Sequence, residues 1–184
     1  MFLNKKSKGF TVLEMAAVFF FMSLILLAVM VNYRKDKSSL ALWRSANSFA
    51  QSIRSIQTMA GKENLNCKVD GAYVEGYSHS YGVYIDTSND ESYLIFADCN
   101  GDNLYGEGDQ IVSEVIIETE VKISDFTPKE DNKIHIVFVP PKPEVFINAS
   151  STEAEITFYA WQSPTETRTI KVNKIGRIEF TQVE

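Results

Sequence analysis

The clearest pattern in the sequence is a long run of apolar residues near its start. Only Thr11, Glu14 and Ser23 interrupt the apolar side chains between Phe10 and Val31. These 22 residues would rise about 33 Å as an α-helix, more than the roughly 30 Å of a bilayer's hydrocarbon core. The run therefore predicts a membrane-spanning helix, which we place at residues 10–33.

A second helical pattern follows the first. Apolar residues recur in steps of four and three, as expected for one face of an amphipathic helix, at Leu42, Ala46, Phe49, Ile53, Ile56 and Ala60. Gly61 and Lys62 are typical of a helix end. We expect residues 34–62 to form a stem that continues the first helix, interrupted, if at all, near residues 37–39. The apolar stripe is expected to pack on the protein's own sheet, with a coiled-coil seam as the alternative.

Residues 63–184 alternate short β-rich runs with clusters of turn residues. The runs predict strands at residues 81–86, 92–97, 111–118, 133–139, 145–148, 155–161, 169–172 and 177–181. Hairpin connections are expected at 173–176 and around 163–165, and the prolines of 140–143 should end a strand. The fold class is α+β, a long N-terminal helix packed on an antiparallel head of one sheet or two small ones.

Composition and charge narrow the range of functions. The 184 residues carry 18 Lys and Arg against 24 Asp and Glu, a net charge of -6. This balance argues against a general nucleic-acid-binding protein, which needs a basic surface to neutralise phosphates. Neither His79 nor His135 belongs to a recognisable catalytic motif. We therefore expect no enzymatic activity.

The start of the apolar run has its own chemistry. Lys5, Lys6, Lys8 and Gly9 precede it, and Glu14 lies inside it. An acid within a membrane segment is costly and usually functional, and it calls for a cationic partner. Cleavage after Gly9 would create one, the α-amine of Phe10. An ordinary secretory signal is disfavoured, because its apolar stretch is shorter and ends in small residues.

Lys-Gly-Phe-Thr-Val-Leu-Glu, residues 8–14, resembles the signal of type IV prepilins. The resemblance implies that residues 1–9 are a leader, which a prepilin peptidase removes after Gly9 before it methylates Phe10. It also implies that Glu14 aligns subunits during filament assembly. Loss of the leader would leave 15 basic and 24 acidic residues, since three of the 18 basic ones precede Gly9. The chain departs from many pilins in having no proline in the second half of the run.

Within this class the head is similar to the H-type minor pseudopilins of type II secretion (GspH/FimT-like). The similar segments are 48–64, 95–112 and 170–178. The resemblance implies a single-pass protein of the inner or plasma membrane with an extracytoplasmic head. It would be a structural subunit of the pseudopilus, assembled with other pseudopilins through an inner-membrane platform and facing secreted cargo.

Two other functions stay open. One is a minor pilin of a type IV or DNA-uptake pilus. DNA binding itself is not expected, since Arg177 is followed closely by Glu179 and the mature chain is acidic. The other is a membrane-anchored extracytoplasmic binding module that never polymerises.

The loop 98–109 has the spacing of a calcium-binding loop. Oxygen-bearing side chains fall at its positions 1, 3, 5 and 12, and a main-chain carbonyl at position 7 completes the set: Asp98, Asn100, Asp102, Asp109 and the carbonyl of Leu104. Asn103 replaces the usual glycine at position 6, and an aspartate replaces the usual glutamate at position 12. The alternative is a turn-rich strand connection without metal. No other cofactor is expected.

Cys67 and Cys99 are the two cysteines of the chain. On the topology implied by the resemblance they lie outside the cytoplasm, where disulfides form readily. We expect a disulfide between them, with two buried free thiols as the alternative.

Overall fold

The computed structural model describes residues 9–62, 67–69, 72–73, 80–140, 144–148 and 150–183. The chain divides into two compact units, Met1–Lys37 and Ser38–Glu184. One helix, α1 (Val12–Lys62), has residues in both units. It is continuous, so the interruption considered near residues 37–39 does not occur. Its continuity follows from the sequence, because neither glycine nor proline occurs between residues 10 and 60.

The first unit contains the apolar part of α1. Val12–Met30 has a mean hydropathy of 2.5 and is the one helix among the described residues that is long and apolar enough to cross a membrane. Every described side chain from Gly9 to Met30 is exposed. An uncovered apolar surface of this length indicates a lipid or protein environment rather than water.

The second unit combines the stem part of α1 with antiparallel strands. Eleven strands occur in the described residues. Their bounds are β1 (Lys68–Val69), β2 (Ala72–Tyr73), β3 (Ser80–Asp86), β4 (Ser92–Asp98), β5 (Gln110–Ile116), β6 (Val121–Thr127), β7 (Lys133–Val139), β8 (Glu144–Ile147), β9 (Glu153–Ala160), β10 (Ser163–Asn173) and β11 (Ile178–Val183).

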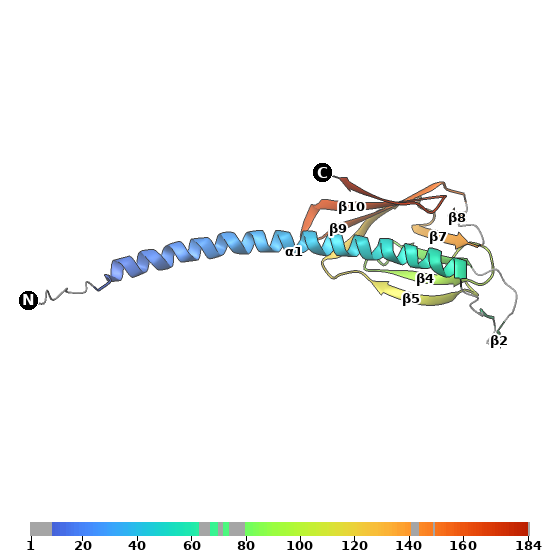
Figure 1. The fold of residues 1–184 in the computed structure, drawn as a ribbon, viewed down its shortest axis with the longest axis horizontal. Helices are drawn as coiled ribbons and strands as arrows, with labels where there is room; N and C mark the ends of the chain where they lie inside the picture. The colour runs from blue at the N-terminus through green and yellow to red at the C-terminus, as the bar shows by residue number, and fades with distance from the viewer. Residues whose placement is uncertain are drawn as a thin grey trace, which may run out of the picture. The chain divides into compact units, whose positions relative to one another are not determined.

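These strands form two main sheets and a small ribbon (Figure 1). The five-stranded sheet has the order β5-β4-β3-β7-β8, the four-stranded sheet has the order β11-β10-β9-β6, and β1 pairs with β2. Strand β6 lies between β5 and β7 in the sequence but belongs to the other sheet. The chain therefore crosses from one main sheet to the other and back. This confirms the α+β class.

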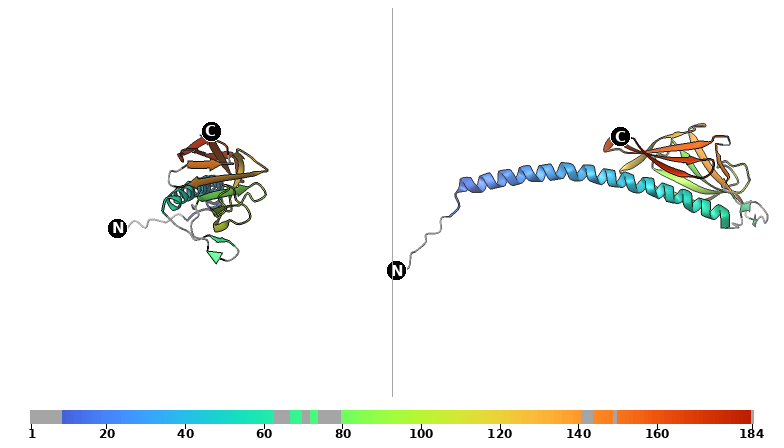
Figure 2. Two further views of the ribbon diagram at one scale, coloured as in Figure 1. Left: turned by 90° about the vertical axis from the view of Figure 1, so that its right-hand side faces the viewer. Right: turned by 45° about the horizontal axis from the view of Figure 1, so that its top comes forward.

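The stem covers the core between the two main sheets (Figure 2). The six apolar positions of its predicted stripe are all buried, the most exposed being Ala60 at 8%. The ring of Phe49 lies 5.0 Å from that of Tyr93 on β4 and 5.5 Å from that of Phe158 on β9. The stripe thus packs on the protein's own sheets, as expected, and is not available as a coiled-coil seam.

The predicted strands agree with the structure in most places, but β1, β2 and β6 are not among them and one turn is displaced. Strand β6 was not expected, because a bulge between Ile123 and Asp125 interrupts its alternation. Residues 163–165 were expected to form a turn but begin β10, and the turn lies at Trp161 and Gln162 instead. A second bulge, between Ser163 and Thr167, lets this strand contain Pro164.

Candidate functional site

Glu14 belongs to a capping box at the start of α1. The backbone N–H and the hydroxyl of Thr11 donate to Glu14 Oε2 at 2.8 and 3.0 Å, and the Glu14 N–H donates to Thr11 Oγ1 at 3.2 Å. Two otherwise unpaired N–H groups at the helix start are satisfied in this way. We predicted a cationic partner for Glu14 from the sequence, but not these hydrogen bonds with Thr11. The Thr-x-x-Glu spacing of the two residues is nevertheless typical of a capping box.

The predicted cleavage site directly precedes this capping box. Gly9 lies before the helix, and a Cβ atom added to it would meet nothing within 4 Å. Phe10 is 85% exposed. The bond between the two residues therefore lies in an uncrowded segment. The basic residues of the predicted leader lie outside the described residues.

The loop after β4 is built around a buried carboxylate. Asp98, 1% exposed, accepts hydrogen bonds from the Gly101 and Asn103 N–H groups at 2.7 and 3.0 Å. Asn103, at the position where such loops usually have glycine, has a left-handed φ of 62°, and Gly101 has a φ of 78°. Such φ values suit Gly and Asn, which explains these residue types here.

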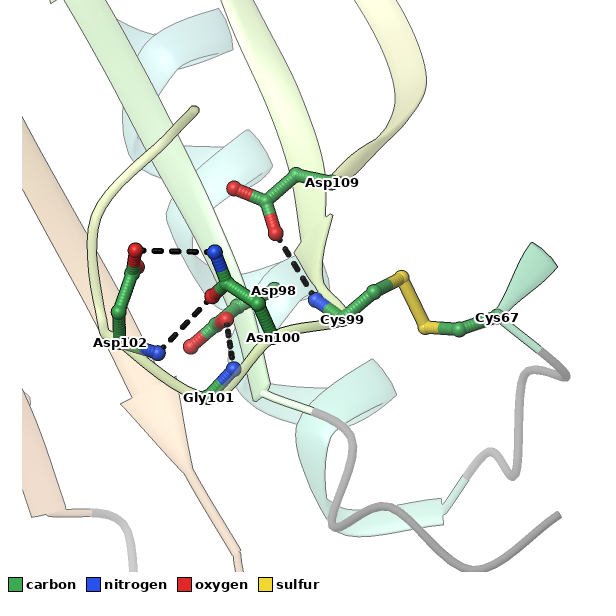
Figure 3. The surroundings of a disulfide bond; sticks show 7 residues. All are labelled: Cys67, Asp98, Cys99, Asn100, Gly101, Asp102 and Asp109. Atoms are coloured by element: carbon green, nitrogen blue, oxygen red, sulfur yellow. Dashed lines mark hydrogen bonds between the residues drawn. A yellow bond between two sulfur atoms is a disulfide. The ribbon is translucent and has the colours of Figure 1, made fainter. Parts of the chain in front are cut away.

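The other loop carboxylates complete the same network. Asp109 accepts from the Cys99 and Gly106 N–H groups at 3.0 and 2.8 Å, so it joins the two ends of the loop. Asp102 accepts from the Leu104 N–H at 2.8 Å and from the side-chain amide of Asn100 at 2.9 Å. In Figure 3 the side chain of Asn100 lies against Asp102, with its oxygen accepting from the Asp102 N–H.

Three of the five predicted calcium ligands come together. One carboxylate oxygen from each of Asp98, Asp102 and Asp109 lies within 4.8 Å of the others. Burial is the main cause that raises the pKa of both Asp98 and Asp109, against the backbone hydrogen bonds that lower it. Such a group of oxygens could ligate a hard cation. The backbone hydrogen bonds also account for the loop conformation without a bound cation, so calcium binding stays a prediction.

The expected disulfide is present at the base of this loop. Cys67 and Cys99 are bonded, with their Cα atoms 5.7 Å apart (Figure 3). Cys99 follows Asp98 directly, and its N–H is the one that donates to Asp109. The covalent link and the carboxylate network therefore hold the same end of the loop.

His135 fixes the middle of the loop, a role that sequence reasoning missed. The Tyr105 N–H donates to His135 Nδ1 at 2.8 Å, and the Tyr105 ring lies 4.7 Å from that of Tyr84 and 5.2 Å from that of Phe96. Burial, and then the charge of Lys133, lower the pKa of His135. His135 is thus a neutral hydrogen-bond acceptor on the outer face of the five-stranded sheet. His79 lies outside the described residues.

A cleft of about 310 Å³ lies between the two main sheets. Its carboxylates already have partners. Asp90 pairs with Lys122 at 3.1 Å, Asp86 accepts from Tyr84 Oη at 2.8 Å, and Asp125 accepts from the Phe126 N–H at 2.9 Å. Each of the three described acids that line the cleft is therefore paired.

Comparison with known proteins identifies no relative of this chain. No family model, no curated protein and no solved structure matches it.

Proposed function

We propose that the chain is a minor pseudopilin, a structural and non-enzymatic subunit of a type II secretion pseudopilus. The observation that carries this proposal is the sequence of residues 8–14, which leads into the apolar helical span Val12–Met30 and overlaps its first turn. A small residue, an uncrowded peptide bond and a glutamate five positions into the apolar run occur together there. A plain anchor needs none of these features.

Assembly would use the two properties of the apolar helix. Its exposed apolar surface would hold the subunit in the bilayer and later pack against neighbouring helices in the filament. Removal of the leader would place a positive amine at Phe10, next to the capping box. Both hydrogen bonds from Thr11 use Oε2 of Glu14. The carboxylate therefore retains lone pairs for an amine of a neighbouring subunit, and a buried charge requires such a partner.

The head supports an extracytoplasmic location. The Cys67–Cys99 disulfide fits an oxidising compartment. The proposal accordingly places the head in the periplasm or at the cell surface. The partners would be a prepilin peptidase, the inner-membrane assembly platform, other pseudopilins and secreted cargo.

Two alternatives remain proposals of lower rank. A minor pilin of a type IV or DNA-uptake pilus would share the processing and the apolar helix. A gene for a retraction ATPase beside this one would favour it, whereas an outer-membrane secretion channel would favour the pseudopilus. A membrane-anchored binding module would keep its leader and stay monomeric.

The mature N-terminus tests the proposal. Intact mass and N-terminal sequencing of the protein from its native membrane should give a chain that begins at methylated Phe10. Gly9→Ala should stay uncut. Since a Cβ at Gly9 meets nothing within 4 Å of the chain itself, the loss would reflect recognition by the peptidase and not misfolding.

Glu14→Ala separates processing from assembly. This variant should be cleaved normally but should appear in sheared or pelleted filaments at a small fraction of the wild-type amount. Glu14→Gln is the matched variant, because it can still accept from Thr11 but has no charge. An intact Met1 in cells that contain the peptidase, or normal assembly of both variants, would contradict the proposal.

A further inference from the structure

Strand β5 is an edge of the five-stranded sheet and is exposed on both faces. In the described residues it pairs only with β4. Ile111 is 51% exposed, Val112 37% and Ile116 79%. Natural edge strands are often protected by lysine, proline, other charges, a bulge or a covering segment. Strand β5 contains a bulge and one charged residue, Glu114, but neither lysine nor proline.

The register shows which backbone groups of β5 face outward. The Ile117 N–H donates to the Glu91 carbonyl at 2.8 Å, just beyond the pairs Ser92–Ile116 and Tyr93–Val115. Because hydrogen-bonded and non-bonded pairs alternate in an antiparallel ladder, the N–H and C=O groups of Ile116 and Glu114 point away from β4. Beyond the bulge, the same alternation means that the N–H and C=O groups of Ile111 also point away from β4.

The surroundings of β5 are strongly acidic. Residues 69–121 contain 12 Asp and Glu and no Lys or Arg. Lys122 forms ion pairs with Asp90 and Glu91 at 3.1 and 3.2 Å, and Arg44 lies 3.7 Å from Glu118. Glu114, in the middle of the edge, accepts from Ser92 Oγ at 2.7 Å and forms no ion pair among the described residues.

We propose that the β5 edge binds an extended basic segment of a neighbouring subunit, which adds to the sheet as a further antiparallel or parallel strand. Ile111, Glu114 and Ile116 share the outer face with Phe96, Leu94 and Ser92, their cross-strand partners. A segment with a Lys or Arg between two apolar residues would match this apolar–acidic–apolar order. The inference rests on the proposed function, because it takes the neighbour to be another filament subunit.

The charge also argues against a second copy of this chain at the same edge. Antiparallel pairing of β5 with a second β5 centred on Glu114 would oppose Glu114 to Glu114, and any other register would still bring two acidic edges together. Like charges directly across a strand pair are destabilising. The edge therefore favours a different subunit over self-association.

Site-specific photocrosslinking tests the inference in the full-length protein in its native membrane. Ile111→p-benzoylphenylalanine places the probe on the edge. The same replacement at Ile175, which is 74% exposed in the turn between β10 and β11, is the control. The Ile111 probe should give an adduct whose cross-linked peptide carries Lys or Arg between apolar residues, and the control probe should not.

Substitutions on the same edge show how the segment is bound. Ile116→Pro removes an N–H that the pairing with β4 does not use, so the fold should persist while the adduct yield falls about 2- to 12-fold, the factor for one net hydrogen bond. Ile116→Thr keeps this N–H, so its adduct yield should fall less than that of Ile116→Pro. Glu114→Lys should abolish the adduct, and an acidic replacement of the mapped basic residue should restore it. The Cys67–Cys99 disulfide, seen as a mobility shift on reduction, confirms folding of each variant.

Each other outcome overturns the inference. An adduct to a second copy of this chain would make β5 a self-association edge. An adduct that survives both Ile116→Pro and Glu114→Lys would exclude strand addition. Absence of an adduct at Ile111 would exclude docking. Cleavage at Gly9 and filament pelleting, measured on the same cells, report the proposed function separately, so either can fail while the other holds.

Discussion

Gly82 on β3 shows how closely single residues are packed on the outer face of the five-stranded sheet. A Cβ atom at this position would lie 2.7 Å from Cε1 of Phe96 and 2.9 Å from Cγ2 of Val137. Real Cβ atoms do not approach so closely, so the side chains or the strands would have to shift. The glycine is required by the contact between neighbouring strands.

Gly82→Ala should therefore lower the free energy of unfolding by about 1–3 kcal/mol, the usual cost of overpacking. Chemical denaturation of the full-length protein in detergent measures the change. Gly106→Ala is the matched control, because a Cβ there meets nothing within 4 Å. Equal effects of the two substitutions would contradict the packing argument.

His135 gives the fold a dependence on pH. Its Nδ1 accepts the Tyr105 N–H, and burial lowers its pKa from the ordinary 6.5. The folded state therefore binds this proton less readily than the unfolded chain. The stability that the neutral imidazole contributes is complete above pH 6.5 and is lost as the pH falls through the lowered folded pKa.

His135→Gln isolates this effect. Glutamine can still accept the Tyr105 N–H but does not titrate. The difference in unfolding free energy between wild type and variant should be constant above pH 6.5 and should shift against the wild type below it. Denaturant titrations between about pH 5 and 8 measure the difference. A difference that does not change with pH would mean that His135 is protonated equally in both states.

At the scale of elements, the stem is the best-predicted part of the second unit. Its stripe was predicted from spacing alone, and the structure buries all six positions. The strands were harder to predict. Strand β6 has only Val121, Ile123 and Phe126 buried, with a bulge among them, so its pattern has no clean period of two.

Phe49→Ala should cost about 3–5 kcal/mol of unfolding free energy, since the fully buried ring contacts both main sheets. When the full-length protein is denatured, loss of helical structure in the stem and loss of packing in the core between the sheets should occur together. Gln51→Ala, on the exposed side of the same helix, is the control and should change stability by less than about 0.5 kcal/mol. A small effect of Phe49→Ala would mean that the stem does not hold the sheets together.

At the scale of the whole molecule, the disulfide ties the region after the stem to the end of β4. Cys67 and Cys99 are separated by 32 residues. Closing a loop of this length restricts the unfolded chain by about 3–4 kcal/mol in the chain-entropy account.

Cys67→Ser should lower the unfolding free energy by that amount, and so should Cys99→Ser. The double variant should cost no more than either single one, because the same bond is lost in each. Denaturation with and without reductant checks this, since reductant should affect the wild type alone. Additive effects of the two substitutions would indicate separate packing roles for the two side chains.

The sequence alone was sufficient for features set by neighbouring residues. An apolar run of sufficient length, the absence of glycine and proline between residues 10 and 60, and the stem's periodicity determine α1. Runs with clear turn signals determine most strands. The residues 8–14 that suggest a prepilin signal are likewise contiguous.

Only the tertiary structure decided which distant groups meet. It assigned β6 to the second sheet, showed the expected Cys67–Cys99 disulfide in place of two free thiols, and brought His135 to the Tyr105 N–H. It also left β5 at an edge, where Ile111 and Ile116 are exposed although isoleucine side chains favour burial. The reason is physical: periodicity records that a side chain prefers burial, whereas the partner that buries it, or its absence, depends on segments far away in the chain.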